Sequence, residues 1–174
     1  MNGYLRIMNE VTKRSISSKV SSKWTESTVL TVKKSKFKGY CIAIHDRKDI
    51  PQALQGLMEI EKALKKATHP QMYAFKIGNS PSNSDSPLRV VDQGYHDDGE
   101  GGAGLRLQGL LDRTKLVNIL IVVARWYGGT PLGSLRFRCI SDVATECLQL
   151  AGYLTNRQKI SNDNLIDFTI IDKQ

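Results

Sequence analysis

The feature that most constrains the fold of this chain is an almost uninterrupted apolar run at residues 117–125 (VNILIVVAR). Such a run is typical of a strand that is central in a sheet or covered on both faces. Glycine-rich corners stand on either side of it, at residues 99–102 and 128–133, and charged residues lie at both corners. This arrangement predicts a surface site on a rigid α/β frame.

Strand and helix patterns surround this run. β-branched or alternating residues predict strands at residues 27–32, 34–45 and 71–78. Helical spacing predicts a helix from the N-cap Asp49 to about residue 67, a second around residues 105–111, and a third over 137–151 that Gly152 stops. We therefore expect one domain at residues 27–155, preceded by a basic flexible arm (1–26) and followed by a C-terminal tail or edge strand (156–174).

The positive charge is concentrated at the N-terminal end. Residues 1–38 carry nine Lys or Arg against two acids, a net of +7, whereas residues 39–174 carry sixteen against fifteen, a net of +1. A basic, Ser-rich arm usually keeps a protein soluble. More specific roles for such an arm are contact with RNA or acidic surfaces, or targeting to mitochondria. We expect a cytoplasmic protein, with a mitochondrial location as the alternative.

Three further features favour an intracellular protein with no membrane association. The apolar run is far too short to span a bilayer, and no secretory signal follows Met1. The three cysteines, Cys41, Cys139 and Cys147, have no CxxC spacing, so we expect reduced, buried thiols.

The turn at residues 128–133 (GGTPLG) has the position of a phosphate-binding loop but not its chemistry. Gly128 and Gly133 have Walker spacing, but Ser134 and Leu135 stand where the Lys and Ser/Thr of that motif belong. A tight connection that needs glycine backbone angles explains it better, and no cofactor is predicted.

Asp97, Asp98 and Glu100 form an acidic turn before the second predicted helix. We expect them to cap that helix and to pair with Arg125 or Arg106, in preference to a metal site. An acid–base pair between His96 and these aspartates is conceivable in sequence, but no serine or cysteine has a nucleophile context. We therefore predict no catalytic residues and no metal ligands.

Cations and aromatic residues alternate around the glycine turn. Arg125, Trp126 and Tyr127 precede it, and Arg136, Phe137 and Arg138 follow it. Either Trp126 and Phe137 are core residues beside solvated arginines, or the cluster stacks on a protein partner or on RNA bases.

Several motifs together resemble the IMPACT family. They are DDGEGGAGLRLQGLL at residues 97–111 and NILIVVARWYGGTPLGSLRFRCISDVA at 118–144, with SKFKGY at 35–40 and ATHPQMYAFKIG at 67–78. The resemblance spans about residues 28–152 in the right order. The acidic turn is closer in shape to the eukaryotic branch, and we expect a chain without the RWD domain that precedes the IMPACT domain in eukaryotic regulators.

The resemblance implies an α+β fold, a two-layer α/β sandwich of the type found in ribosomal proteins and in domain IV of the translocase, with a mixed sheet and helices on one face. It also implies regulation of translation in the stress response to amino-acid starvation. Eukaryotic members compete for the ribosome-associated activator of the initiation factor two kinase, and they bind actin.

We therefore expect a non-enzymatic binding protein in translational control, with that translational activator and actin as partners. The alternative is a ribosome- or nucleic-acid-binding module that uses the basic arm and the Arg/aromatic cluster. The expected shared binding surface consists of Asp97, Asp98, Glu100, Arg125, Tyr127, Gly128, Gly129 and Arg136. If the two glycine corners meet in space, these residues form one composite surface.

Overall fold

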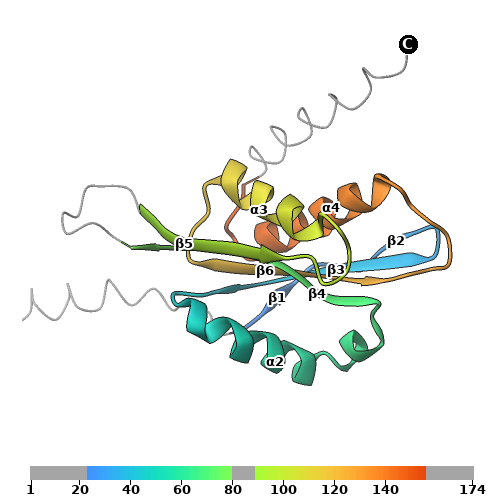
Figure 1. Ribbon diagram of the computed structural model, residues 1–174, viewed down its shortest axis with the longest axis horizontal. Coiled ribbons are helices and arrows are strands. Elements are labelled where there is room, and N and C mark those ends of the chain that lie inside the picture. Colours follow the sequence, from blue (N-terminus) through green and yellow to red (C-terminus); the bar gives the residue numbers. More distant parts are fainter. Residues whose placement is uncertain (1–22, 80–88, 156–174) are drawn as a thin grey trace, which may run out of the picture.

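The apolar run forms β6 (Ile119–Trp126), the central strand of a six-stranded sheet (Figure 1). The structure is a computed structural model that describes residues 23–79 and 89–155. β6 pairs with β3 (Ser35–Ala43) along one edge and with β4 (His69–Asn79) along the other. Its residues from Ile119 to Arg125 are all buried, so the prediction of a central, covered strand is confirmed.

Three more strands complete the described sheet on both sides. β5 (Arg89–His96) pairs with β4, while β1 (Thr25–Glu26) and β2 (Leu30–Val32) pair with different parts of β3. The expected mixed sheet is wrong, because every pairing among the described strands is antiparallel. β3 and β4 do run parallel to each other, but β6 lies between them and is antiparallel to both.

Helices cover both faces of this sheet, so the α+β class is confirmed but the expectation of helices on one face is wrong. Ile119, Ile121 and Val123 of β6 face the core formed with α3 (Ala103–Thr114) and α4 (Leu135–Leu150). The intervening residues face a second core formed with α2 (Ile50–Ile60), which lies on the opposite side of the sheet (Figure 1). Since neighbouring strand residues point to opposite faces, a strand apolar at every position needs two covers.

The first predicted helix is two elements. α2 ends at Ile60, Glu61 leaves helical geometry at φ −100° and ψ 82°, and a 3₁₀ segment, η2 (Lys62–Lys66), follows. Asp49 occupies the N-cap position without a capping hydrogen bond, while Asp46 caps the short 3₁₀ turn η1 (Arg47–Asp49) just before it. Gly152, at φ +81°, follows the end of α4 as predicted.

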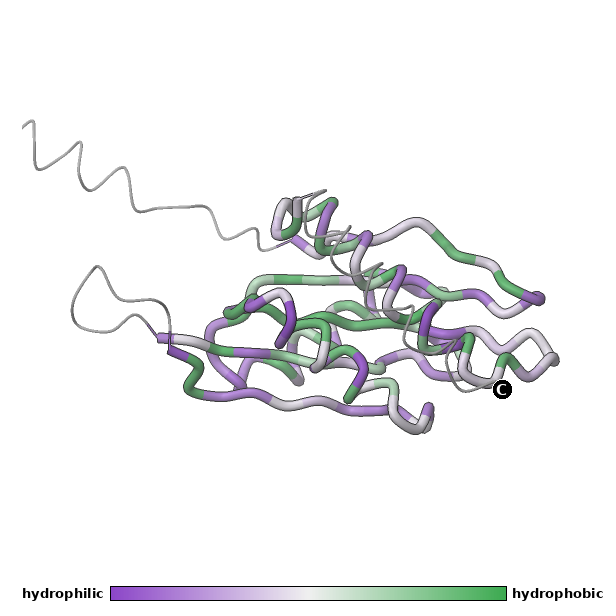
Figure 2. The backbone as a smooth tube through the Cα atoms, turned by 90° about the horizontal axis from the view of Figure 1, so that it is seen from above, coloured by the Kyte–Doolittle hydropathy of each residue, from purple (hydrophilic) through white to green (hydrophobic). Residues whose placement is uncertain are grey.

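α4 lies directly against the backbone of β3. A Cβ atom added to Gly39 would be 2.5 Å from the carbonyl oxygen of Val143, so only glycine fits there. Figure 2 shows the long hydrophobic stretches on the inner strands and mixed colouring along the helices. Across residues 23–79 and 89–155, no helix is long and apolar enough to cross a membrane.

The described fold begins at β1, two residues before the expected domain start at residue 27. Most of the basic arm and the whole segment 156–174, with its expected edge strand, lie outside the described residues. The predictions for these two segments therefore remain predictions.

Candidate binding site

Asp97 caps the N-terminus of α3 from five residues before its N-cap position, Gly102. Its Oδ2 accepts a hydrogen bond from the Gly102 amide at 3.0 Å, and its Oδ1 accepts one from the Gly104 amide at 2.7 Å. Gly102 occupies the N-cap position at φ +87°, and it has no side chain that could cap. The expected capping role is therefore confirmed for Asp97, because its carboxylate satisfies amides that have no partner within the helix.

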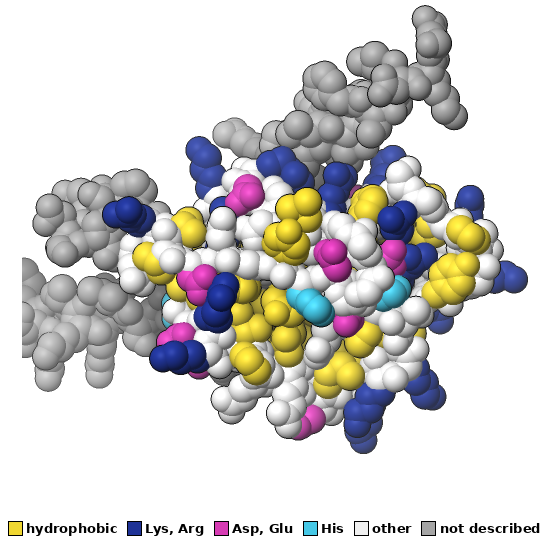
Figure 3. Space-filling view, viewed as in Figure 1, with side chains coloured by type: hydrophobic (Ala, Val, Ile, Leu, Met, Phe, Trp, Pro, Cys, Tyr) yellow, Lys and Arg dark blue, Asp and Glu magenta, His cyan; other side chains and the backbone are white. Residues whose placement is uncertain are grey.

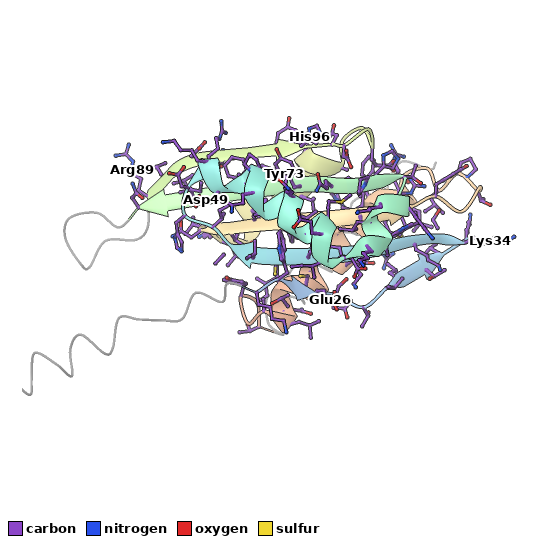
Figure 4. The ribbon with its side chains drawn as sticks, turned by 90° about the horizontal axis from the view of Figure 1, so that it is seen from below. Glu26, Lys34, Asp49, Tyr73, Arg89 and His96 are labelled. Carbon is purple, nitrogen blue, oxygen red and sulfur yellow. The ribbon has the colours of Figure 1, made fainter. Side chains whose placement is uncertain are left out.

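Asp98 ties the acidic turn to the start of β4. Its Oδ2 accepts a hydrogen bond from the Gln71 amide at 2.7 Å, and its carbonyl oxygen lies 2.8 Å from His69 Nδ1. Since a carbonyl oxygen only accepts, His69 carries its proton on Nδ1. His96 is 4.0 Å from Asp98 and its ring lies against Tyr73 (Figure 4), so the two do not form the hydrogen-bonded acid–base pair considered from the sequence.

Glu100 joins the acidic turn to both sides of the glycine turn. Its Oε2 accepts a hydrogen bond from Nη1 of Arg125, the last buried residue of β6. Its Oε1 lies 2.8 Å from Nε of Arg136, on the first turn of α4. His69 Nε2 lies 3.4 Å from Oε2. The two glycine corners therefore meet in space, around one buried carboxylate.

Arg125 is a buried partner in this cluster. It is 5% exposed, and its guanidinium carbon lies 5.5 Å from the ring centre of Phe37 and 5.4 Å from that of Tyr127. Arg136 stacks on Phe137 at 4.2 Å, while Arg106 donates to Ser141 instead of reaching the acidic turn. The predicted ion pair between the acidic turn and Arg125 is thus confirmed, and the alternative pairing with Arg106 is wrong.

The glycine turn is held by close backbone approach. The Gly128 amide donates to Ser35 Oγ at 3.1 Å, and a Cβ atom on Gly128 would lie 2.1 Å from the carbonyl carbon of Lys34. Gly129 has a positive φ of 86° and open space around it. These contacts support the expectation that the turn requires glycine for its geometry.

The eight residues predicted as a shared surface therefore differ in what they offer to a partner. Glu100 and Arg125 are buried, and four others are half-buried: Asp97, Asp98, Gly128 and Arg136. Tyr127, at 47% exposure, and Gly129 form the exposed part. His69 and Gln71 also belong to this cluster but were not predicted as site residues, because their only signal in the sequence is their place near the start of the strand pattern.

The three acids have little capacity left for chemistry. Each carboxylate is engaged by backbone amides or by cationic side chains. In the part of the chain that the structure describes, no three His, Cys, Asp or Glu side chains converge as a metal site would require. Figure 3 shows acidic and histidine side chains side by side on one face of the molecule. The fold and this cluster define a compact α+β domain in which the charged residues of the acidic turn stabilise the structure of the domain itself.

Comparison with known proteins assigns this domain to a family. The Impact N-terminal domain matches residues 33–148, and the chain belongs to the IMPACT family. It is 41% identical to "IMPACT family member YDL177C" of Saccharomyces cerevisiae, over 75% of this chain and 93% of that protein. It is 31% identical to "Protein IMPACT" of Homo sapiens over 76% of this chain, but it spans only 39% of that protein's length.

A solved structure has a similar fold. A crystal structure of a hypothetical protein superposes with a TM-score of 0.58 at 23% identity, over 74% of this chain and 58% of the other. A structure of the two-domain translational regulator Yih1 is 30% identical with a TM-score of 0.47, over 73% of this chain and 46% of that one.

Proposed function

We propose that this chain is a non-enzymatic binding module that acts in translational control through a protein partner. The observation that carries the proposal is the use of Asp97, Asp98 and Glu100, which are engaged by amides and guanidinium groups within the domain. Carboxylates that are engaged in this way stabilise the fold and do not take part in a reaction. Membership of the IMPACT family supports the translational context.

At finer detail, we propose that the partner is the translational activator of the initiation factor two kinase, and that binding limits kinase activation during amino-acid starvation. This follows from the family resemblance, which also suggests actin as a second partner. The proposed location is the cytoplasm, where that activator works.

The test is a pull-down with the tagged full chain from starved and unstarved cells, with blotting for the activator, for actin and for phosphorylated initiation factor two. Tyr127→Ala should weaken recovery because Tyr127 is the exposed aromatic residue of the expected surface. The matched control is Tyr95→Ala, which removes a tyrosine of similar exposure, 50%, from β5. Equal recovery with both variants would remove Tyr127 from the surface, and recovery of neither partner by the unaltered chain would overturn the function.

A second candidate, binding to ribosomes or RNA, is favoured by the net charge of +7 on residues 1–38. Neutralised phosphates make affinity fall with salt, so a chain lacking residues 1–22 should show a shallower slope of log affinity against log salt. Identical slopes for the two chains would refute a role for the basic arm.

A further inference from the structure

A groove of about 370 Å³ lies on the α2 side of the sheet, separate from the Glu100 cluster. Its apolar lining includes Trp126, Ala63 and Val29, from β6, η2 and the loop before β2. The Trp126 indole is fixed in place because its Nε1 donates to the carbonyl oxygen of Ala63 at 3.2 Å. The groove therefore offers a preformed apolar floor.

Three lysines of the β2–β3 hairpin line the same groove, and they differ in how they are paired. Lys38 Nζ lies 2.8 Å from a Glu26 carboxylate oxygen and 3.2 Å from one of Glu61, so its charge is offset. Lys34 and Lys36 are exposed and have no acidic partner among residues 23–79 and 89–155. The unbalanced positive charge thus lies at the rim, and Figure 4 shows Lys34 at one end of the sheet.

Tyr40 also lines the groove, and its hydroxyl lacks a partner. The residue is 1% exposed, and its Oη has no hydrogen-bond partner in the part of the chain that the structure describes. Burial, with smaller contributions from Glu61 and Glu26, raises the pKa of this phenol above 10.0. The hydroxyl therefore stays protonated, and a buried donor without an acceptor favours any ligand that supplies one.

We propose that this groove binds an acidic peptide segment of a partner protein, with an apolar side chain against Trp126 and carboxylates at Lys34 and Lys36. Charge complementarity at the rim selects the acidic peptide, and a peptide carbonyl or carboxylate oxygen accepts from Tyr40. The inference rests on the proposed function, because it supplies the surface for its protein partner.

Two other occupants fit the groove less well. A nucleic acid would bring phosphates towards Glu61, which lines the groove, and the lysine nearest this carboxylate is already paired. A second copy of the chain, with its net charge of +8, offers no excess of acidic groups for Lys34 and Lys36.

The test pans a displayed library of random 12-residue peptides on the immobilised full chain. We expect enrichment of peptides with several Asp or Glu around one aromatic or aliphatic residue. The dissociation constant of the most enriched peptide, made synthetically with a fluorescent label, is then measured by anisotropy. The double variant Lys34→Glu with Lys36→Glu should weaken binding about tenfold, because two exposed ion pairs become like-charge contacts. Tyr40→Phe should weaken it about fivefold, as expected when one hydrogen bond is lost.

The matched control makes the same charge change outside the groove, with Arg89→Glu at the other end of the sheet from Lys34 (Figure 4) and Lys48→Glu on η1, and should leave the affinity unchanged. Enrichment of neutral or basic peptides, or equal affinity for the two double variants, would overturn the proposal. So would tighter binding of a 12-nucleotide single-stranded RNA, or self-association that the Lys34/Lys36 variant abolishes. Failure here with an intact cellular pull-down refutes only the groove, since the pull-down tests the function independently.

Discussion

Replacing Glu100 by glutamine removes the one negative charge that faces two guanidinium groups. The Glu100 and Arg125 side chains are 8% and 6% exposed, and Arg136, on the other carboxylate oxygen, is 28% exposed. Arg125 cannot shed its proton, so the variant holds an uncompensated buried charge close to a second cation. Removing one partner of a buried ion pair costs about 3–5 kcal/mol, a large share of a total of about 5–15 kcal/mol for a typical domain.

Removing the cation instead should cost less. In Arg125→Met the carboxylate still has the Arg136 guanidinium, with Nε at 2.8 Å, so its negative charge remains paired. The expected loss is about 2 kcal/mol, from one charged hydrogen bond and the stacking on Phe37 and Tyr127. The predicted order of stability is therefore the unaltered chain first, then Arg125→Met, then Glu100→Gln.

Urea unfolding followed by circular dichroism measures this order. With a slope of about 2 kcal/mol per molar urea, Glu100→Gln should lower the midpoint by roughly 2 M and Arg125→Met by roughly 1 M. Glu59→Gln is the control, because Glu59 is exposed on α2 and its carboxylate accepts a hydrogen bond from the neighbouring Gln55 side chain. The free energy of unfolding of this variant should stay within about 0.5 kcal/mol of the unaltered chain. A smaller loss for Glu100→Gln than for Arg125→Met would refute the argument that Glu100 neutralises both cations.

Three further predictions follow from the fold. Asp97→Ala should cost about 1–2 kcal/mol because two amides at the start of α3 lose their hydrogen-bond acceptor, and Asp97→Asn should recover part of this loss. An alanine variant as stable in urea as the unaltered chain would refute the capping role. Gly39→Ala should cost more than about 2 kcal/mol, since its Cβ would be 2.5 Å from the carbonyl oxygen of Val143. Gly56→Ala, in open space on α2, should instead stabilise the domain by about 1 kcal/mol. Equal shifts in melting temperature for the two variants would contradict the close contact at Gly39. The folded-state pKa of Tyr40 lies above 10.0, so its contribution to the free energy of unfolding is present below that pH and is lost as pH rises. Tyr40→Phe should therefore flatten the fall in unfolding free energy above about pH 10. An unchanged slope of unfolding free energy against pH would count against the buried phenol.

The central strand and the capped turn could be predicted because their signals are local. The run at 119–124 is apolar at every position, so it needed cover on both faces wherever it lay in the sheet. Asp97 stands where a carboxylate can reach the first amides of α3. The helices on both faces follow from that same run. The expectation of helices on one face came instead from the resemblance.

The remaining features depend on contacts across the fold. The break between α2 and η2 occurs at Glu61, whose side chain accepts from the Ala63 amide and reaches Lys38 on β3. The groove combines residues from near positions 29–40, 61–63 and 126, which share no sequence motif. Likewise, the burial of Arg125 follows from its stacking on Phe37 of a neighbouring strand, and charge alone suggested an exposed residue.

The strand order β1-β3-β6-β4-β5 also governs how the chain folds during synthesis. β6 is the last of the six described strands to leave the ribosome, yet it occupies the centre of the sheet. Until Trp126 has emerged, the edges of β3 and β4 that pair with β6 in the folded domain have no partner strand. Unpaired edges of this kind readily associate with other chains. A nascent chain arrested before residue 119 should therefore require protection that the finished domain does not.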